Sequence, residues 1–422
     1  MIYKLRLTGL NRLVVLLIFL LLSIGAQAEM LYVVNSQSRT LSRIDTVSDA
    51  VNNSFASLGN TPNKVVVDED YLWVVCSGDN AVQKLSRSDG SLVANVFIGM
   101  SSNPWDAVLH EGYLYVSGLF TGKVYKVDTN SNSVVASVNV GYAPEGLCVF
   151  GDKLYVANAG NYMQNYAGSS VSVIALDSFT TEGTIPVSAN PQYLSVHNRK
   201  IHVSCTGNWA DIGGAVCVID PLSNSVVETI PLGGTPGCLW MAGDELAYVG
   251  DSNGAVMYSY NPTAFSVLHG AENPLAMGAS EIVGNASFIA LLSPVWGSNG
   301  IVKLVHPDLS HWKQYTVALM PTDMKLYSPS SANEDLVVSA KPLNLYPNPV
   351  RKGTTLKISG TDATGGELSL YNLKGQLVHH QSFEGTELQL PELQLAAGVY
   401  LYQVQSLNGK GTSYKGKLVL RR

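Results

Sequence analysis

The stretch Leu154-Tyr-Val-Ala-Asn-Ala159 recurs in variant form along most of the 422-residue chain and decides its fold class. Its apolar, β-branched and aromatic residues are typical of a short strand buried in a sheet. The equivalent stretches start 40 to 47 residues apart. They are Leu31-Tyr-Val-Val-Asn35, Leu72-Trp-Val-Val-Cys76, Leu114-Tyr-Val-Ser-Gly118, Leu154-Tyr-Val-Ala-Asn158, Ile201-His-Val-Ser-Cys205, Ala247-Tyr-Val-Gly-Asp251 and Phe288-Ile-Ala-Leu-Leu292.

Each stretch belongs to a repeat of four short strands. A second series such as Val171-Ser-Val-Ile174 and a third such as Thr229-Ile-Pro-Leu-Gly233 follow it, and a proline then introduces a fourth strand. These prolines are Pro62, Pro104, Pro144, Pro191, Pro236, Pro274 and Pro321. Seven such repeats of about 40 to 45 residues predict an all-β fold, a seven-bladed β-propeller over residues 29–328.

The two ends of the repeat region are expected to share one blade. The first repeat begins at a second strand, Leu31–Asn35, so its missing first strand is expected from Asp323-Met-Lys-Leu-Tyr327. Pairing these segments would close the ring. Leu336-Val-Val-Ser-Ala340 is either a further strand or part of a linker over residues 329–340.

Composition limits the function. The chain is 46% apolar and 14% charged, with a net charge of −6. Binding to nucleic acid draws on clustered lysine and arginine, and no basic cluster stands out, so we expect no nucleic-acid partner.

The first 28 residues are expected to be an export signal. Lys4, Arg6 and Arg12 precede the apolar run Leu13–Leu22, and Ala26-Gln-Ala28 offers a cleavage site. The apolar run is short for a membrane span. We therefore expect an exported mature chain that starts near Glu29 and contains no transmembrane span.

Five cysteines remain, an odd number, and their spacing matches no zinc pattern. Most are expected to be small buried apolar residues. Cys205 and Cys217 flank a predicted hairpin loop, and they are the pair to test for a disulfide.

A module of different character covers residues 341–422. Alternating segments such as Glu367-Leu-Ser-Leu-Tyr371 and Val399-Tyr-Leu-Tyr-Gln-Val404 are separated by glycine-containing turns. This pattern predicts a small Ig-like β-sandwich.

The module resembles the type A C-terminal sorting domain of type IX secretion substrates. The matching stretches are Tyr346-Pro-Asn-Pro-Val350, Tyr371-Asn-Leu-Lys-Gly-Gln376, Ala397-Gly-Val-Tyr-Leu-Tyr402 and Lys415-Gly-Lys-Leu-Val-Leu420. The resemblance implies that the type IX machinery is a partner and that the protein reaches the outer-membrane surface or the medium. The motif residues carried over are Tyr346, Pro347, Asn348, Pro349, Gly398, Tyr400 and Lys417.

The repeats resemble the YVTN-type repeats of bacterial surface-layer and periplasmic propellers. Leu154-Tyr-Val-Ala-Asn-Ala159 and Leu72-Trp-Val-Val-Cys76 carry the resemblance, from which Phe288 onward departs. It implies the fold and leaves function open, because propellers host many activities.

Catalytic motifs are largely missing from the sequence, and no catalytic residue, metal or cofactor is predicted. Asp45, Asp128 and Asp220 end equivalent strands and are expected to make turns. The histidines are expected to be scattered surface residues, although His197 and His202 could converge. Whether the protein is an enzyme stays open: a non-enzymatic binding or interaction module is favoured, with a lyase or lactonase-like hydrolase or a purely structural envelope protein as alternatives.

Binding residues are expected at one mouth of the propeller. The loops before the first strands and after the second strands meet at the same face, and three of the latter are enlarged: 158–168, 206–214 and 294–299. Aromatic side chains beside amides suit a small molecule, a glycan or a protein partner. The candidate residues are Trp105, Asp106, Glu145, Tyr162, Tyr166, Gln192, Tyr193, Trp209, Asp211 and Trp296.

Overall fold

The computed structural model describes residues 29–328, 344–346, 348, 350–351, 355–359, 365–372, 377–385, 387–389, 395–406 and 413–421. The chain divides into two compact units, Met1–Ala332 and Asn333–Arg422. The predicted export signal, the linker with its alternative strand at 336–340, and Pro347 and Pro349 lie outside the described residues.

The first unit consists of seven four-stranded antiparallel sheets, which are the blades of a propeller. In its described residues it has no α-helix, only two 3-10 turns, η1 (Ser77–Asp79) and η2 (Tyr162–Gln164). The all-β propeller fold predicted from the sequence is therefore confirmed.

The strands occupy four equivalent positions in the blades. The innermost strands are β28 (Pro321–Tyr327), β4 (Pro62–Val67), β8 (Pro104–His110), β12 (Pro144–Phe150), β16 (Pro191–His197), β20 (Pro236–Met241) and β24 (Glu281–Gly284). The second strands are β1 (Met30–Asn35), β5 (Tyr71–Cys76), β9 (Tyr113–Gly118), β13 (Lys153–Asn158), β17 (Lys200–Cys205), β21 (Ala247–Asp251) and β25 (Ile289–Ser293). The third strands are β2 (Thr40–Asp45), β6 (Ala81–Ser86), β10 (Lys123–Asp128), β14 (Ser170–Ala175), β18 (Ala215–Asp220), β22 (Met257–Asn261) and β26 (Asn299–Val305). The outer strands are β3 (Val51–Ser57), β7 (Leu92–Phe97), β11 (Ser133–Asn139), β15 (Thr180–Pro186), β19 (Ser225–Ile230), β23 (Ser266–His269) and β27 (His311–Leu319).

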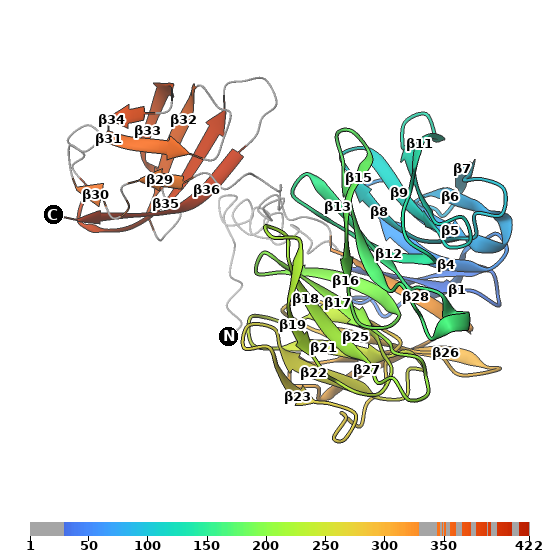
Figure 1. Cartoon of the computed structure of the whole chain (residues 1–422). Helices are drawn as coiled ribbons and strands as arrows, with labels where there is room; N and C mark the ends of the chain where they lie inside the picture. Colours follow the sequence, from blue (N-terminus) through green and yellow to red (C-terminus); the bar gives the residue numbers. More distant parts are fainter. Residues whose placement is uncertain are drawn as a thin grey trace, which may run out of the picture. The chain divides into compact units, whose positions relative to one another are not determined.

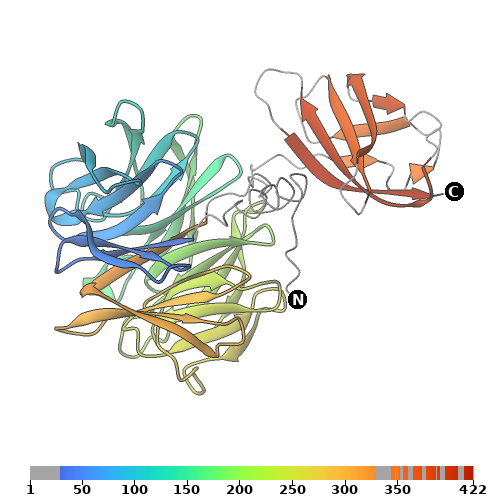
Figure 2. The same ribbon diagram turned by 180° about the vertical axis from the view of Figure 1, so that it is seen from behind.

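The ring is closed by the two ends of the first unit. The innermost strands contact one another in the cyclic order β28, β4, β8, β12, β16, β20, β24 and again β28. Strand β28 pairs antiparallel with β1, with Leu31 opposite Leu326. This pairing of the orange strand with the blue sheet is visible in Figure 1 and from behind in Figure 2. The predicted pairing of the segment 323–327 with the first repeat is confirmed.

The core lies between neighbouring blades. Second strands such as β1 and β5 are buried almost throughout, whereas the outer strand β7 is mostly exposed. Val75 of β5 packs in one apolar cluster with Val116 of β9, from the next blade. Because each blade is covered on both faces by its two neighbours, the second strands read as continuous apolar runs rather than as alternating ones.

The same turn precedes most of the innermost strands. Thr61, Asn103, Ala143, Asn190 and Met320 all adopt left-handed backbone conformations, with φ between 43° and 60°. Each stands directly before the proline that begins a strand. The recurring proline therefore marks a repeated turn rather than an accidental similarity.

Pro274 does not introduce a strand, which corrects the prediction for this repeat. Strand β24 begins at Glu281, and Leu275 makes only an isolated bridge to Met257. The longer connection in this repeat separates the proline from the strand that it would otherwise start.

The turn-making role predicted for three aspartates is confirmed. Asp45 Oδ1 accepts hydrogen bonds from the backbone N–H groups of Val47 and Ser48. Asp128 makes the corresponding bonds to Asn130 and Ser131, and Asp220 accepts from Leu222. These carboxylates satisfy backbone donors of their own turns, and Asp220 also pairs with Lys200 at 3.1 Å.

The second unit is a sandwich of two sheets, as predicted. One sheet has the order β29 (Asn344–Tyr346), β31 (Thr355–Ser359), β34 (Glu387–Gln389). The other has the order β30 (Val350–Arg351), β36 (Ser413–Arg421), β35 (Gly398–Ser406), β32 (Gly365–Tyr371), β33 (Leu377–Glu384). Leu356 from the first sheet and Leu368 and Leu418 from the second share one buried core.

Asn348, from the motif Tyr346–Val350, binds the backbone of this unit through its side chain. Its Nδ2 donates to the carbonyl oxygen of Lys417 at 2.7 Å, and its Oδ1 accepts from the N–H of Val419 at 2.9 Å. The side-chain amide thus pairs with the edge of β36 as a peptide group of a strand would. Tyr400, also in the motif, donates its hydroxyl to the Ala396 carbonyl at 2.8 Å.

Candidate functional site

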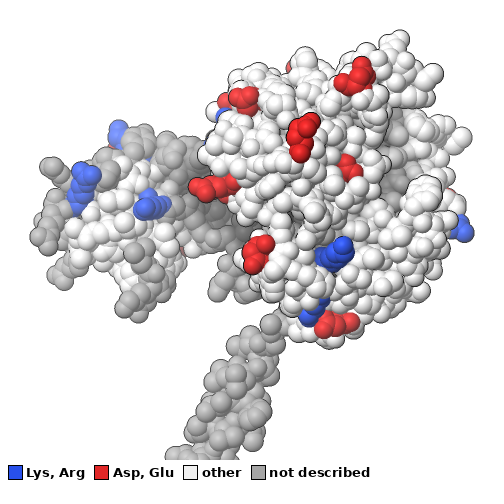
Figure 3. Space-filling model, turned by 90° about the horizontal axis from the view of Figure 1, so that it is seen from below, with Lys and Arg blue, Asp and Glu red and all other residues white. Residues whose placement is uncertain are grey.

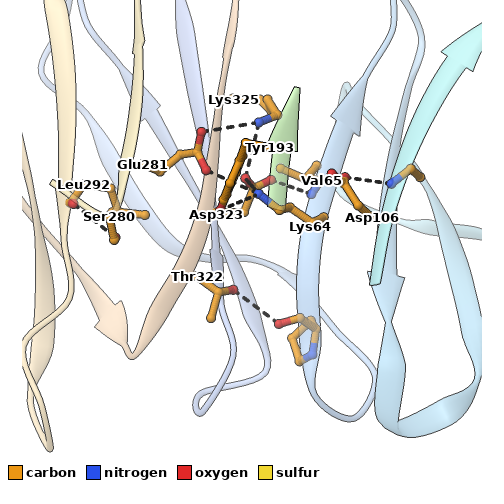
Figure 4. A network of polar contacts seen from close by, with 12 residues as sticks. Lys64, Val65, Asp106, Tyr193, Ser280, Glu281, Leu292, Thr322, Asp323 and Lys325 are labelled. Atoms are coloured by element: carbon orange, nitrogen blue, oxygen red, sulfur yellow. Dashed lines mark hydrogen bonds and ion pairs between the residues drawn. The ribbon is translucent and has the colours of Figure 1, made fainter. Parts of the chain in front are cut away.

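The innermost strands carry a network of charged side chains (Figure 4). Lys64 Nζ on β4 lies 3.1 Å from Asp323 Oδ1 on β28 and 3.3 Å from Glu281 Oε2 on β24. Lys325 reaches the same Asp323 oxygen at 3.3 Å. Asp323 also accepts the backbone N–H of Val65 at 2.8 Å. The network ties the first innermost strand along the chain to the last two.

The pKa values in this network follow from burial and mutual charge. Burial by itself disfavours the charged form of Lys64, but Asp323 and Glu281 hold the pKa of Lys64 well above its ordinary value. Burial likewise opposes ionisation of Asp323, yet Lys325, Lys64 and the Val65 N–H bring its pKa below the usual value. For Glu281 burial dominates and raises the pKa, against the effect of the two lysines. Asp323 and Lys64 therefore form the firmest ion pair.

Two predicted residues extend this network. The Tyr193 hydroxyl accepts a hydrogen bond from Lys64 Nζ at 3.2 Å, and Nζ also stands 4.4 Å from the tyrosine ring centre. Asp106 Oδ1 accepts the N–H of Ala107, and burial raises the pKa of Asp106 against the effect of Lys64. Both side chains are thus engaged inside the ring.

Glu145 is a buried acid at the start of the innermost strand β12. Burial, together with the Asp106 carboxylate, raises the pKa of Glu145 to about 8, while Lys64 and a hydrogen bond with Trp105 oppose the shift. At neutral pH this carboxyl is therefore mostly protonated, and it can donate as well as accept a hydrogen bond.

Tyr166 and Trp209 form an aromatic pair, which we call the aromatic shelf. Their ring centres are 5.9 Å apart, although they belong to loops of neighbouring blades. Trp209 is 48% exposed and donates its Nε1–H to Ser252 Oγ at 3.1 Å. Burial raises the pKa of Tyr166, and the Glu145 carboxylate adds to this effect.

The loops that hold the shelf are internally tied. Tyr166 N donates to the carbonyl of Asn161 at 2.8 Å, and the Asn208 side chain accepts the N–H groups of Ala210 and Ile212. Both shelf residues have left-handed backbones, with φ of 60° for Tyr166 and 57° for Trp209. Such values are uncommon for bulky residues and mark positions held by their surroundings.

The remaining predicted residues lie apart from the shelf contacts. Tyr162 is exposed, Gln192 donates to Asn190 Oδ1 at 3.5 Å, and Asp211 accepts from Asn208 Nδ2 at 2.8 Å. Trp296 instead lines a pocket with Arg39 and with residues at the start of β28. The single mouth of the prediction is therefore divided in the structure.

Sequence reasoning missed Lys64, Glu281 and Lys325. Lys64 and Lys325 each stand beside apolar strand residues, where a lysine ordinarily points to solvent. Only the cyclic arrangement of β4, β24 and β28 brings them together. Pro62 could have indicated the position of Lys64, because the recurring proline marks the start of an innermost strand.

His202 corrects the prediction of scattered surface histidines. It is 1% exposed, and its ring centre is 6.3 Å from that of His197. Its Nδ1 lies 2.9 Å from the Tyr260 hydroxyl. Burial, with a smaller contribution from His197, lowers the pKa of His202 to about 4.

This histidine makes stability depend on pH. The unfolded chain binds the proton near pH 6.5 and the folded chain only near pH 4, so the contribution is complete above pH 6.5 and is lost as pH falls to 4. The loss should approach roughly 3 kcal/mol. We expect urea unfolding of His202→Gln to lose this part of the pH dependence, whereas exposed His311→Gln should keep it. Equal pH profiles for wild type and His202→Gln would contradict the assignment.

All five cysteines are buried and free. Cys205 Sγ lies 4.0 Å from Cys217 Sγ, which is the pair singled out by the sequence. The contact with Cys205 lowers the pKa of Cys217 to about 6, against the effect of burial. The remaining thiols fill apolar clusters, as Cys76 does between the first two blades.

The face of the molecule in Figure 3 shows no basic patch, and the described residues show no metal centre. On the face of the molecule in Figure 3, lysine and arginine side chains are scattered and do not merge into a patch. In the described parts of the chain, no group of three or more His, Cys, Asp or Glu side chains is arranged to hold a metal ion. The same residues include no helix long and apolar enough to cross a membrane.

Comparison with solved structures gives distant similarities. U3-55K aligns with a TM-score of 0.48 and 14% identity over 61% of this chain and 82% of that one. The RRP9 WD40 repeats align with a TM-score of 0.47 and 14% identity, over 61% and 81%. Apo AztD from Citrobacter koseri aligns with a TM-score of 0.46 and 12% identity, over 71% and 98%. No curated protein matches the sequence.

A family model does match the second unit. Residues 344–421 match the secretion system C-terminal sorting domain. The matched range contains Asn348 and Tyr400, whose side chains bind the backbone of the sandwich. The chain thus carries a C-terminal sorting domain of the type IX secretion system, and it is exported to the cell surface or the extracellular space.

Proposed function

We propose that this protein is an exported, non-enzymatic binding module in which a seven-bladed YVTN-type propeller captures a ligand at the aromatic shelf. The N-terminal segment 1–28 would direct the chain into the secretion route, and the type IX machinery would then act on the sorting domain. The observation that carries the proposal is the contact between Tyr166 and Trp209 across two blades, with both residues in left-handed conformations.

The chemistry of the shelf favours a neutral saccharide. The exposed indole of Trp209 offers a flat apolar face on which a sugar ring can stack. Asn208 and Asp211 stand in the same loop as Trp209, and Gln192 stands on β16 of the same blade, so this loop and blade also carry amide and carboxylate groups. The mostly protonated Glu145 adds a donor without adding full negative charge.

The loops of the aromatic shelf are held by hydrogen bonds, so they should lose little conformational entropy when a ligand binds. Asn161, Asn208 and Ser252 fix the loop backbones and the indole N–H by hydrogen bonds. A ligand would therefore meet aromatic faces that are already in position, and preorganisation of this kind reduces the entropic cost of association.

The test is binding of neutral oligosaccharides to the purified mature protein by calorimetry, with cello-, malto- and chito-hexaose as probes. We expect at least one to bind, and Trp209→Ala to weaken it at least tenfold, or ~1.4 kcal/mol. Phe120→Ala is the matched control, since Phe120 is an exposed aromatic residue in another inter-strand loop. No binding by any of the three, or unchanged binding by Trp209→Ala, would contradict the proposal.

A glycine variant separates folding from binding. Glycine accepts a φ of 57° without steric cost, so Trp209→Gly should melt no lower than Trp209→Ala. Both variants should lose the saccharide. A Trp209→Gly protein that binds as well as wild type would show that the indole serves the loop and not a ligand.

A further inference from the structure

A pocket lies where the two ends of the propeller meet, away from the shelf contacts. It has a volume of about 590 Å³. Its walls come from the β1–β2 loop, the β3–β4 turn, the β25–β26 loop and the start of β28. We call it the seam pocket, and its lining residues used below are Gln37, Arg39, Asn60, Trp296 and Thr322.

Arg39 is the one charged residue that lines the seam pocket. Its Nη1 donates to Asn60 Oδ1 at 2.7 Å, and no carboxylate among the described residues lies within ion-pair distance of it. The guanidinium carries further N–H donors beyond the one that this bond uses. The cation is therefore fixed in place without being neutralised.

A relay of hydrogen bonds orients this guanidinium. Asp79 accepts both the backbone N–H of Asn60, at 2.7 Å, and its side-chain Nδ2, at 2.6 Å. With its nitrogen committed to Asp79, the Asn60 amide must present its oxygen to Arg39. Asp79 and Asn60 thus act as positioning residues for the arginine.

Trp296 supplies the other chemical feature of the pocket. Its side chain is 90% exposed, although it is the largest apolar side chain of the loop. It has no described ring contact or hydrogen bond of its own within residues 29–328. An indole that contributes so little to the core offers a flat face to a ligand.

We propose that the seam pocket binds a saccharide that carries a carboxylate, such as a uronic acid oligomer. The arginine fork matches the planar carboxylate, the indole stacks on the sugar ring, and Gln37, Asn60 and Thr322 provide amide and hydroxyl groups for its hydroxyls. The absence of any lining acid selects the acidic over the neutral sugar. This site is separate from the aromatic shelf and does not depend on the proposed function there.

The experiment compares hexagalacturonate with its fully methyl-esterified form on the purified mature protein, by calorimetry at low and moderate salt. The acid should bind at least tenfold more tightly than the ester, with a preference that shrinks as salt rises. Arg39→Gln should weaken the acid at least tenfold and leave the ester unchanged. Trp296→Ala should weaken both probes alike, because it removes stacking and not charge.

Variants at sites outside the seam pocket serve as controls. Arg199→Gln changes an exposed arginine in the β16–β17 turn and Phe120→Ala an exposed aromatic residue, and neither should alter binding. Trp209→Ala should also leave the hexagalacturonate affinity unchanged, which distinguishes this site from the shelf. Equal affinity for acid and ester, no binding of the acid, or an Arg39→Gln protein that binds it normally would each overturn the proposal.

Discussion

Replacing Asp323 with alanine is expected to lower the free energy of unfolding by about 3–5 kcal/mol, which is the usual cost of removing one partner from a buried ion pair. Asp323 is fully buried and receives Lys64, Lys325 and the N–H of Val65. Its loss leaves Glu281 as the one carboxylate within ion-pair distance of the two lysines among the described residues, and it leaves the Val65 N–H unpaired. The melting temperature of the variant should be roughly 10 °C lower than that of the wild type for a unit of this size.

Two further variants show which part of the side chain matters. Asp323→Asn keeps an acceptor for Val65 but removes the charge, so its stability should lie between those of wild type and Asp323→Ala. Asp308→Ala is the control, because this exposed aspartate bonds only within its own turn, to Ser310. If Asp323→Ala melts like Asp308→Ala, the network does not hold the ring together.

The ion pair also has a pH signature. The folded chain holds the pKa of Asp323 below its ordinary value of 3.8. The stabilisation is therefore fully present above that value and is lost as pH falls through the folded pKa. Asp323→Asn should accordingly flatten the acid limb of the stability curve below about pH 4.

Deletion of residues 341–422 should abolish delivery of the protein to the cell surface or the medium. The sorting domain matched at 344–421 forms its own compact unit with its own core, so its removal takes away the export determinant without opening the propeller. The measurement is surface proteolysis and immunoblotting of cells and medium, with melting of the retained protein to confirm that it is folded. Normal delivery of the shortened chain would refute the assignment.

Asn348→Ala gives a graded version of this result. The substitution removes both bonds between the Asn348 amide and β36, one to Lys417 and one to Val419. Each lost bond costs on the order of 1 kcal/mol, which is a large share of the stability of so small a unit. We expect reduced delivery that recovers at lower growth temperature, whereas Val47→Ala, at an exposed site in the propeller, should be delivered normally.

The repeated strands could be predicted from the sequence because equivalent strands are buried in the same way in each blade. A second strand such as Leu72–Cys76 is covered on both faces, and this burial leaves an apolar run of fixed spacing. Ring closure also followed from the repeats, since a chain that starts at a second strand needs a first strand from its other end. Both the strands and the ring closure therefore follow from the local residue pattern and from the number of strands in each repeat.

The site could be predicted only in part, because its side chains meet across the ring. The loops that carry Tyr166 and Trp209 stand out by their length and aromatic content, and these two residues do touch. The grouping of Trp296 with them overlooked that the blade of β20 to β23 lies between the Trp209 loop and the Trp296 loop. Lys64 and Glu281 are more than 200 residues apart, and no sequence pattern links them.

The position of β28 has a consequence for the synthesis of the protein. Its pairing with β1 joins residues about 300 positions apart, so the ring remains open until the ribosome has made nearly the whole first unit. The sorting domain is translated only after this closing strand. A prematurely terminated product that lacks β28 must also lack the export determinant, and a delivered molecule has always received the strand that completes its ring. The order of the two units thus prevents the export of chains whose synthesis stops before β28.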